Sequence, residues 1–288
     1  MEVVSETQAV LGEGPVWDDR RQVLWWVDIF GQRLHRFDPQ GASTREFLMP
    51  QMIGAVVLRD AGGVVVALEE GFALFDPETE TLHAIVDPEP DVATNRFNDG
   101  KCDARGRFWA GTMSKSEAPG RGTLYSLEPD GEVRRQVGDV SVSNGLAWSS
   151  DNETMYFIDS PTLRIDAFDY ALDTGALNSR RTVVQVTPGS GFPDGMAIDA
   201  EGMLWVGMWN GWQVLRFDPR TGRQIGRLPV PVAQVTSCAF GGSDLQDLYI
   251  TTARIRQTDE QLREQPDAGK LFRTRVEVPG LPAARFAG

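Results

Sequence analysis

Four short stretches of this sequence pair an oxygen-bearing side chain with a glycine, immediately before an apolar run. They are Glu13-Gly14, Asp99-Gly100, Asn144-Gly145 and Asp194-Gly195. Taken singly, Asp-Gly and Asn-Gly pairs mark tight turns. Taken together, carboxylate and amide oxygens are the ligands that hard divalent cations prefer. The four stretches can form a metal site only if the fold brings them together, so the next question is which elements carry them.

A repeat in the sequence identifies these elements. Six runs that could each form a buried strand begin between 40 and 50 residues apart. They are GPVWD (14–18), GAVVL (54–58), GKCDA (100–104), GLAWS (145–149), GMAID (195–199) and SCAFG (237–241). A second and a third β-rich run and a polar turn follow each one, and helical patterning is almost absent. Units of this length predict four-stranded blades, so we expect an all-β fold, a six-bladed β-propeller.

The two ends of the chain suggest how the ring closes. The sixth unit has no outer strand after LFRTR (271–275), whereas EVVSETQA (2–9) precedes the first unit without a partner. We therefore expect the N-terminal strand to complete the last blade, which also removes an exposed sheet edge. No linker interrupts the repeats, so residues 1–288 are predicted to form a single β-propeller domain.

A propeller places equivalent positions of its blades around one axis, so the residue before each inner strand belongs to a ring at the channel mouth. The repeat assigns six residues to this ring: Glu13, Ile53, Asp99, Asn144, Asp194 and Thr236. Three carboxylates facing one another in a narrow channel repel, and a bound cation relieves that repulsion. We therefore expect one divalent metal ion with oxygen ligands. Glycine has no Cβ, so Gly195 is expected to let the backbone approach this ion closely.

Other catalytic chemistries lack the residues they need. The chain has two histidines, His35 and His83, and neither falls near the predicted ring. A Ser-His-Asp triad and a histidine-rich zinc site are therefore excluded at the channel. The sequence also lacks a G-x-S-x-G elbow, a P-loop and a dinucleotide-binding fingerprint. Hydrolysis or hydration by a metal ion and carboxylates remains.

Composition limits the partners. Asp and Glu outnumber Lys and Arg by 41 to 28, without a basic run, so we expect neither nucleic acid nor a membrane surface as a partner. Cys102 and Cys238 lie in separate apolar runs and are predicted to be buried, reduced thiols. The N-terminal MEVVSETQAV has no basic region and no long apolar stretch. We expect a cytoplasmic protein that is a monomer or weak dimer.

Five motifs carry a resemblance to a known family: GEGPVW, NRFNDGKCDARGRFWAGTM, SNGLAWS, PDGMAIDAEGMLWVG and TSCAFGG. Together with QPDAGKLF and the terminal ARFAG, they span nearly the whole chain, and the sequence strongly resembles the regucalcin (senescence marker protein)/gluconolactonase family. The resemblance implies a six-bladed propeller, in agreement with the repeat count. It also implies metal ligands at Glu13, Asn144 and Asp194, which all belong to the ring derived above.

The resemblance further implies that Asp194 is the catalytic acid/base and that Arg96 and Asn98 bind the sugar. In animal members a Glu shortly after GTM contacts the substrate. Here the stretch reads GTMSKSEAPG, so that Ser116 occupies this position and Glu117 follows one place later. The sequence leaves open which of the two contacts the substrate, and it leaves open whether Asp99 assists catalysis.

Three classes of function are compatible with these observations. The favoured one is a metal-dependent hydrolase of sugar lactones, which uses a metal-polarised carbonyl and a carboxylate-activated water; Ca²⁺ is favoured, with Zn²⁺, Mn²⁺, Mg²⁺ or Fe²⁺ as alternatives. The second is a calcium-binding regulatory protein without catalysis, and the third is a protein-binding scaffold. Esterase or organophosphatase activity at the same site is a further alternative. Arg96 and Asn98 favour the enzyme, because cation storage needs neither of them.

Overall fold

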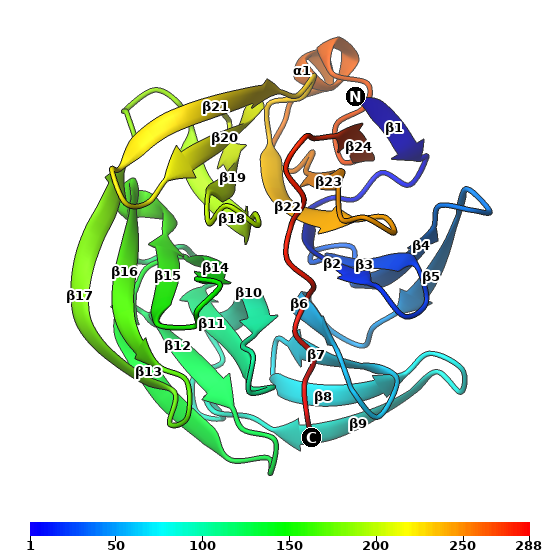
Figure 1. Ribbon diagram of the computed structural model, residues 1–288. Coiled ribbons are helices and arrows are strands. Elements are labelled where there is room, and N and C mark those ends of the chain that lie inside the picture. The colour runs from blue at the N-terminus through cyan, green and yellow to red at the C-terminus, as the bar shows by residue number, and fades with distance from the viewer.

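The computed structural model describes residues 1–288. Its strands pair antiparallel into six four-stranded sheets that surround one axis (Figure 1). The predicted all-β, six-bladed β-propeller is therefore confirmed. The inner strands neighbour one another in the order β2, β6, β10, β14, β18 and β22, and β22 returns to β2. The third and sixth blades consequently face each other across the axis.

The strands of each blade run outward from the axis in chain order. The first blade contains β2 (Gly12–Asp18), β3 (Val23–Asp28), β4 (Arg33–Asp38) and β5 (Ser43–Leu48). The second contains β6 (Ile53–Leu58), β7 (Val64–Leu68), β8 (Gly71–Asp76) and β9 (Thr81–Val86). The third contains β10 (Asn95–Cys102), β11 (Phe108–Ser114), β12 (Gly122–Leu127) and β13 (Val133–Val140). The fourth contains β14 (Ser143–Trp148), β15 (Thr154–Asp159), β16 (Arg164–Ala171) and β17 (Ala176–Gln185). The fifth contains β18 (Phe192–Ile198), β19 (Leu204–Trp209), β20 (Gln213–Asp218) and β21 (Arg223–Pro229).

The last blade closes the ring. It contains β22 (Val235–Gly241), β23 (Asp247–Thr252) and β24 (Leu271–Arg275), and its outer strand is β1 (Glu2–Ser5) from the N-terminus. Glu2 lies opposite Arg273 in the β1–β24 pairing, and the two side chains form an ion pair. The predicted closure by the N-terminal strand is confirmed, and pairing the last blade in this way leaves β24 without a free edge.

The hydrophobic core is divided into six clusters, and each cluster lies between two adjacent blades. Between the first two blades, for example, Trp25 and Phe47 pack with Val56 and Phe75. The apolar residues of the second and third strands in each repeat supply most members of these clusters, and alternate side chains of a strand face opposite neighbours. The core therefore holds the blades in the ring and leaves the axis to the inner strands.

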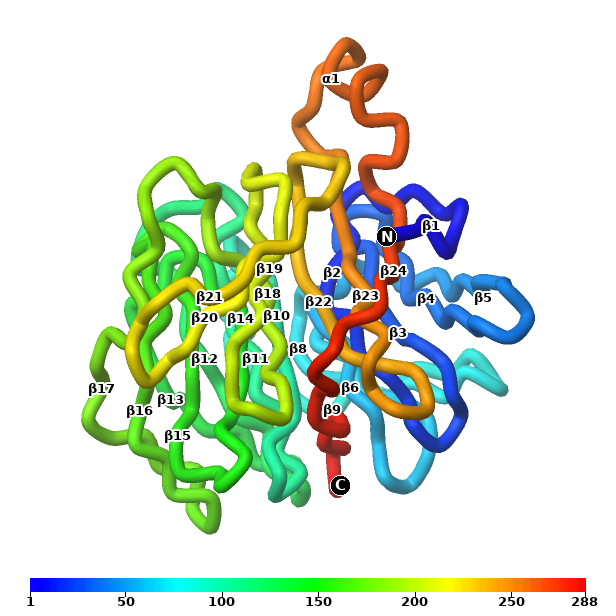
Figure 2. Tube along the Cα trace, turned by 45° about the horizontal axis from the view of Figure 1, so that its top comes forward, coloured from blue at the N-terminus to red at the C-terminus, as the bar shows by residue number.

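The C-terminal tail, residues 276–288, crosses one end of the central channel (Figure 1). It leaves the sixth blade, where the Gly280 amide donates to the Leu245 carbonyl, and reaches the second, where the Phe286 amide donates to the Leu58 carbonyl. Phe286 is buried in the cluster between the second and third blades. Figure 2 shows the short helix α1 (Asp259–Glu264) projecting from one end of the molecule and the C-terminus near the other. No helix reaches the length and hydrophobicity that a membrane span requires.

Candidate active site

Each inner strand contains a register shift close to its first residue. The shifts lie at Glu13–Val16, Ile53–Ala55, Phe97–Gly100, Asn144–Leu146, Pro193–Met196 and Val235–Ser237. Such bulges bend a strand and redirect the side chains beside them. Because the bulges recur at the same place in all six blades, the side chains that precede them gather at one end of the channel.

A cavity of about 230 Å³ lies at this end. All five site residues predicted from the sequence line it: Glu13 from β2, Arg96 and Asn98 from β10, Asn144 from β14 and Asp194 from β18. Apolar residues line the rest of the pocket: Leu11, Met113, Val142, Pro161, Phe192 and Trp209. Residues from four different blades thus meet in one pocket with an apolar wall and a few convergent polar groups, as is typical of a small-molecule site.

The glycines beside these residues have a packing role. A Cβ on Gly145 would lie 2.8 Å from the Asp194 carbonyl oxygen, and a Cβ on Gly195 would lie 2.1 Å from the Ser237 hydroxyl. Glycine therefore lets the inner strands of successive blades converge on the axis. Gly195, expected to let the backbone approach an ion, instead lets it approach the next inner strand.

Two buried acceptor oxygens in the pocket have no donor. The Asn144 amide donates to the Ser160 hydroxyl at 3.0 Å, which fixes its orientation and leaves its Oδ1 without a partner. Asp194 Oδ1 is likewise buried and unpaired. Burial of an acceptor without a donor is costly. These two oxygens and the Glu13 carboxylate are hard donors of the kind that hold Ca²⁺ or Mg²⁺, so the residues present fit a divalent cation.

Burial dominates the electrostatics of these groups. It raises the pKa of Glu13 well above its usual range, and repulsion from Asp194 and then Asp99 adds to this effect. Burial also raises the pKa of Asp194 well above its usual range, again with a contribution from Asp99. A bound cation would favour the ionised forms and reverse these shifts. The arrangement is therefore one that binds either protons or a metal ion.

Arg96 and Asn98 form a fixed pair in the same pocket. Both are buried, and Arg96 Nη1 donates to Asn98 Oδ1 at 2.8 Å and to the Phe97 carbonyl at 2.9 Å. Asn98 in turn donates to the Ser143 carbonyl at 2.8 Å, and the Arg96 guanidinium lies over the ring of Phe30. Burial lowers the pKa of Arg96 to about 10. Five N–H donors belong to a guanidinium, so Arg96 keeps donors for a ligand after these contacts.

Asp99 does not line the pocket, which corrects the predicted ring, although its charge still raises the pKa of Glu13 and Asp194. Its side chain lines a second cavity of about 320 Å³ farther along the channel, under the C-terminal tail. The register shift in β10 spans both Asn98 and Asp99, so these neighbours reach different cavities. Ile53 and Thr236 do not line the pocket either. No three His, Cys, Asp or Glu side chains form a metal-binding group. The candidate ligands are therefore two carboxylates and the Asn144 amide oxygen, and the expected cluster of three carboxylates is wrong.

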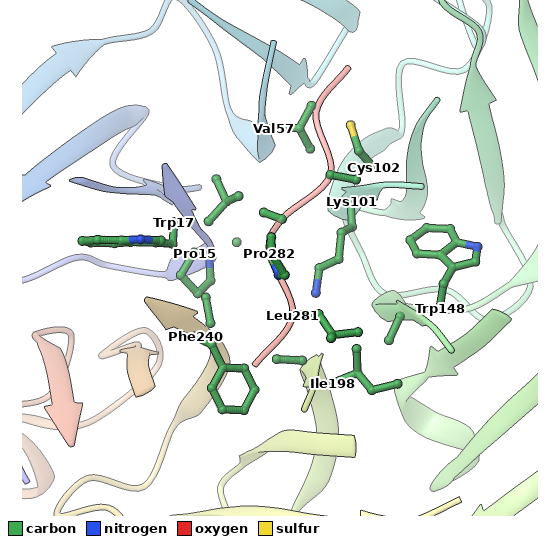
Figure 3. Close-up of a pocket in the computed structure, with 18 of the residues that line it drawn as sticks. Pro15, Trp17, Val57, Lys101, Cys102, Trp148, Ile198, Phe240, Leu281 and Pro282 are labelled. Atoms are coloured by element: carbon green, nitrogen blue, oxygen red, sulfur yellow. The ribbon is translucent and has the colours of Figure 1, made fainter. Parts of the chain in front are cut away.

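The second cavity differs from the pocket in its lining (Figure 3). Pro15, Val57, Ile198 and Phe240 from four inner strands surround it, and the tail residues Leu281–Ala284 cover it. Lys101 extends from β10 toward this tail, and its amine donates to the Met196 carbonyl at 2.6 Å. Cys102 and Cys238 line the same cavity as buried thiols that form no disulfide, which confirms the prediction for both. His35 is buried against Trp26, and neither His35 nor His83 lines the pocket.

The loop after GTM brings Glu117 to the pocket. Glu117 is among the residues that line it, whereas Ser116 is not, and the Ser116 hydroxyl is instead bonded to that of Ser114. Arg256 also lines the pocket and forms an ion pair with Glu117 at 2.8 Å. Arg256 was not predicted from the sequence, because it lies after β23 in a turn that belongs to no motif.

Comparisons with known proteins agree with this architecture. Residues 11–254 match the family described as SMP-30/Gluconolactonase/LRE-like region. The chain is 41% identical to regucalcin from Xenopus laevis, over 99% of this chain and 97% of that protein. It is 39% identical to the Bacillus subtilis protein named "Putative sugar lactone lactonase YvrE", over 99% and 97% of the two chains. The crystal structure of a calcium-binding protein, regucalcin, from Agrobacterium tumefaciens superposes with a TM-score of 0.95 at 30% identity, covering 99% and 96%. The chain therefore belongs to the SMP-30/Gluconolactonase/LRE-like family.

Proposed function

We propose that this protein is a metal-dependent hydrolase that opens sugar lactones to the corresponding aldonic acids. The observation that carries the proposal is the meeting, in one pocket, of two unpaired buried acceptor oxygens with a fixed guanidinium donor: Asn144 Oδ1, Asp194 Oδ1 and Arg96. Membership of a family that includes proteins named for gluconolactonase and sugar lactonase activity supports it.

Glu13, Asn144 and Asp194 would hold the metal ion, for which Ca²⁺ is favoured because all three ligands are oxygens. Zn²⁺, Mn²⁺, Mg²⁺ and Fe²⁺ are the alternatives. When bound, the ion supplies Lewis-acid polarisation of the lactone carbonyl and neutralises developing negative charge. Arg96 and Asn98 would orient the sugar through its hydroxyl groups, while Met113 and Trp209 keep bulk water away from the reacting bond.

Asp194 would act as the acid/base. Its free carboxylate oxygen takes a proton from the attacking water as the water oxygen bonds to the carbonyl carbon. The ring C–O bond then breaks, and Asp194 returns the proton to the departing ring oxygen. The product is a hydroxy acid, and the carboxylate of Asp194 is restored. A lactone is an intramolecular ester, so modest assistance of this kind suffices.

A panel assay tests the proposal. Metal-stripped protein is supplied in turn with Ca²⁺, Mg²⁺, Mn²⁺, Fe²⁺ and Zn²⁺ and assayed against gluconolactone, galactonolactone, xylonolactone and arabinolactone. We expect no turnover without metal and restored turnover of at least one lactone with one or more ions. Absence of turnover across the whole panel with metal bound would contradict lactonase activity.

The second candidate is a calcium-binding regulatory protein without catalysis. The names of the regucalcin relatives, one of them described as calcium-binding, favour it. It predicts tight Ca²⁺ binding and no turnover in the same panel. Including p-nitrophenyl acetate and an organophosphate ester in the panel tests esterase and organophosphatase activity at the same site.

A further inference from the structure

An ion pair crosses the mouth of the pocket from one side of the ring to the other. Glu117 lies in the loop that follows β11 in the third blade, and Arg256 lies after β23 in the sixth blade. These two blades face each other across the axis, and both residues line the pocket. Arg256 Nη1 is 2.8 Å from Glu117 Oε1. We call this ion pair the Glu117–Arg256 bar, because it joins two opposite blades at the exposed side of a pocket whose predicted metal ligands are buried.

The main chain beneath each end of the bar is held in place. On one side, the Lys115 amide donates to the Thr94 carbonyl at 2.9 Å and its amine donates to the Ala93 carbonyl at 2.7 Å. On the other side, Gln234 Nε2 donates to the Ile255 carbonyl at 2.9 Å, directly before Arg256. The distance between the two supports is therefore set by the blades, and the side chains alone close the gap.

Both residues adopt a backbone conformation that suits glycine better. Their φ angles are 57° for Glu117 and 58° for Arg256, in the left-handed region where a Cβ is unfavourable. Thirteen non-glycine residues have positive φ, and these two are the ones that line the pocket. The Arg256 and Glu117 side chains are also 61% and 48% exposed, so their ion pair adds little to stability. Neither backbone preference nor stability explains why a glutamate and an arginine stand at these two positions. Their place at the mouth of the pocket does explain it.

The bar limits the height of a small pocket. The cavity of about 230 Å³ lies below the roughly 300 Å³ at which pockets for drug-sized ligands begin. Arg96, Asn98 and the predicted metal ligands are buried, whereas Glu117 and Arg256 are largely exposed, so a ligand that contacts the buried groups has the bar on its solvent side. A substituent on the side of the ligand remote from the metal would have to displace Arg256 or Glu117.

We propose that the Glu117–Arg256 bar selects lactones by size, with Arg256 as the specificity-determining residue. A lactone that consists of one sugar ring fits beneath the bar, and its hydroxyl groups can bond to Arg256 and Glu117. A lactone that carries a second sugar is excluded. This inference rests on the proposed lactonase function and extends it to the substrate class.

The test compares two lactones with the same reacting ring, gluconolactone and lactobionolactone, which carries an additional galactosyl group. The metal-loaded wild type is measured beside Arg256→Gly and Glu117→Gln. Arg181→Ala is the matched control, because Arg181 forms an exposed ion pair with Asp169 at 2.6 Å on the outer strands of the fourth blade. The readouts are kcat/KM for each lactone, the melting temperature, and calorimetric binding of gluconate and lactobionate.

We expect Arg256→Gly to reduce the ratio of kcat/KM for gluconolactone to kcat/KM for lactobionolactone by about tenfold or more. This is the scale on which single pocket contacts discriminate between substrates. The melting temperature of Arg256→Gly should equal or exceed that of wild type, because glycine removes the backbone strain. Glu117→Gln should change the preference in the same direction by less, and Arg181→Ala should leave it unchanged. An unchanged preference in Arg256→Gly, or an equal change in Arg181→Ala, would overturn the proposal.

If the wild type hydrolyses neither lactone, the proposed lactonase function fails and calorimetry decides the bar separately. Arg256→Gly must then improve binding of lactobionate relative to gluconate by about tenfold, again the scale of one pocket contact. Equal relative binding in wild type and variant would overturn size selection by the bar.

Discussion

The pocket at the start of the inner strands and the cavity beneath the C-terminal tail occupy two ends of one channel, and the same strands line both. The pocket receives Glu13, Asn144 and Asp194, whereas the cavity receives Pro15, Ala147 and Ala197 from those strands. In the pocket, Asn144 Oδ1 and Asp194 Oδ1 are buried without donors. In the cavity, Lys101 is the cation that accompanies Asp99, and its amine is bonded to the Met196 carbonyl.

This difference follows from the bulges. A strand whose side chains alternated without interruption would carry its polar positions along the whole channel. The bulge directs the polar residue before it to the mouth, and the apolar residues after it continue into the core-like cavity. The pocket therefore has an excess of acidic groups that a bound cation would neutralise. The cavity pairs Asp99 with Lys101, and the tail packs over it. We therefore expect mutations in the pocket to change turnover or ligand binding, and mutations beneath the tail to change the free energy of unfolding.

The largest contrast should be between two aspartates. Asp194→Asn keeps an oxygen for the metal but removes the base, so we expect kcat to fall by about 10²- to 10⁴-fold with much of the metal retained. Asp99→Asn, in the cavity, should retain measurable turnover. Both are measured on the best lactone, with metal content determined on the same samples. If Asp99→Asn is inactive with metal fully bound while Asp194→Asn turns over, Asp99 is the base.

The second contrast concerns two phenylalanines. Phe286 of the tail is 2% exposed, so Phe286→Ala should lower the free energy of unfolding by about 3–5 kcal/mol through lost burial and the cavity it leaves. Turnover at 25 °C should remain, because the tail lies at the far end of the channel. Phe192 lines the pocket but is 45% exposed, so Phe192→Ala should change stability by less than about 0.5 kcal/mol and act on KM instead. Denaturant unfolding and steady-state kinetics on both variants check this; a loss of turnover in Phe286→Ala at a temperature where it is folded would link the tail to the site.

The pocket and the cavity beneath the tail also differ in how well the sequence predicts them. Periodic strands and turn residues were enough to predict six blades and closure by EVVSETQA, because every blade repeats the same pattern. The five site residues do meet in one pocket, as their family motifs implied. Asp99 was misplaced because a bulge moves side chains between cavities without leaving a clear mark in the sequence. The course of residues 276–288 was not predicted, because an extended tail without strand partners has no periodicity to read.

The third prediction concerns pH and the metal. Glu13 and Asp194 have folded-state pKa values above their ordinary ones, so their contribution to stability is present below about pH 4, near the unfolded pKa of a carboxyl, and is lost as the pH rises through the folded pKa. Metal-stripped protein should therefore lose this stability toward neutral pH. Glu13→Gln removes one buried charge, so the metal-free variant should become more stable relative to metal-free wild type as the pH rises, while its metal affinity falls.

Melting temperatures between pH 4 and pH 8, with and without Ca²⁺, measure this prediction. An ion at a hundredfold excess over its Kd should stabilise the wild type by about 2.7 kcal/mol, and Glu13→Gln by less. The difference between variant and wild type cancels the titration of carboxyls elsewhere in the chain. If Glu13→Gln instead unfolds more readily at every pH and still binds the metal as tightly, Glu13 is a structural residue of the first blade.

The smallest effect is expected at Arg96, where a lysine tests whether the pocket needs the fixed guanidinium donors or only a positive charge. Arg96→Lys keeps the positive charge but loses the planar guanidinium, whose Nη1 bonds both Asn98 and the Phe97 carbonyl. Asn98 would then lose the contact that orients it, and the sugar would lose its donors. We expect kcat/KM to fall by about tenfold, equivalent to about 1.4 kcal/mol, mainly through KM, with metal content unchanged.

Asn98→Ala should give a similar loss, because it removes the other half of the pair. Arg220→Lys is the control, since Arg220 is an exposed arginine paired with Asp218 outside the pocket, and it should behave as wild type. Unchanged kinetics in both Arg96→Lys and Asn98→Ala would show that the pair supports β10 rather than the substrate, and the polar end of the channel would then act through its metal ligands alone.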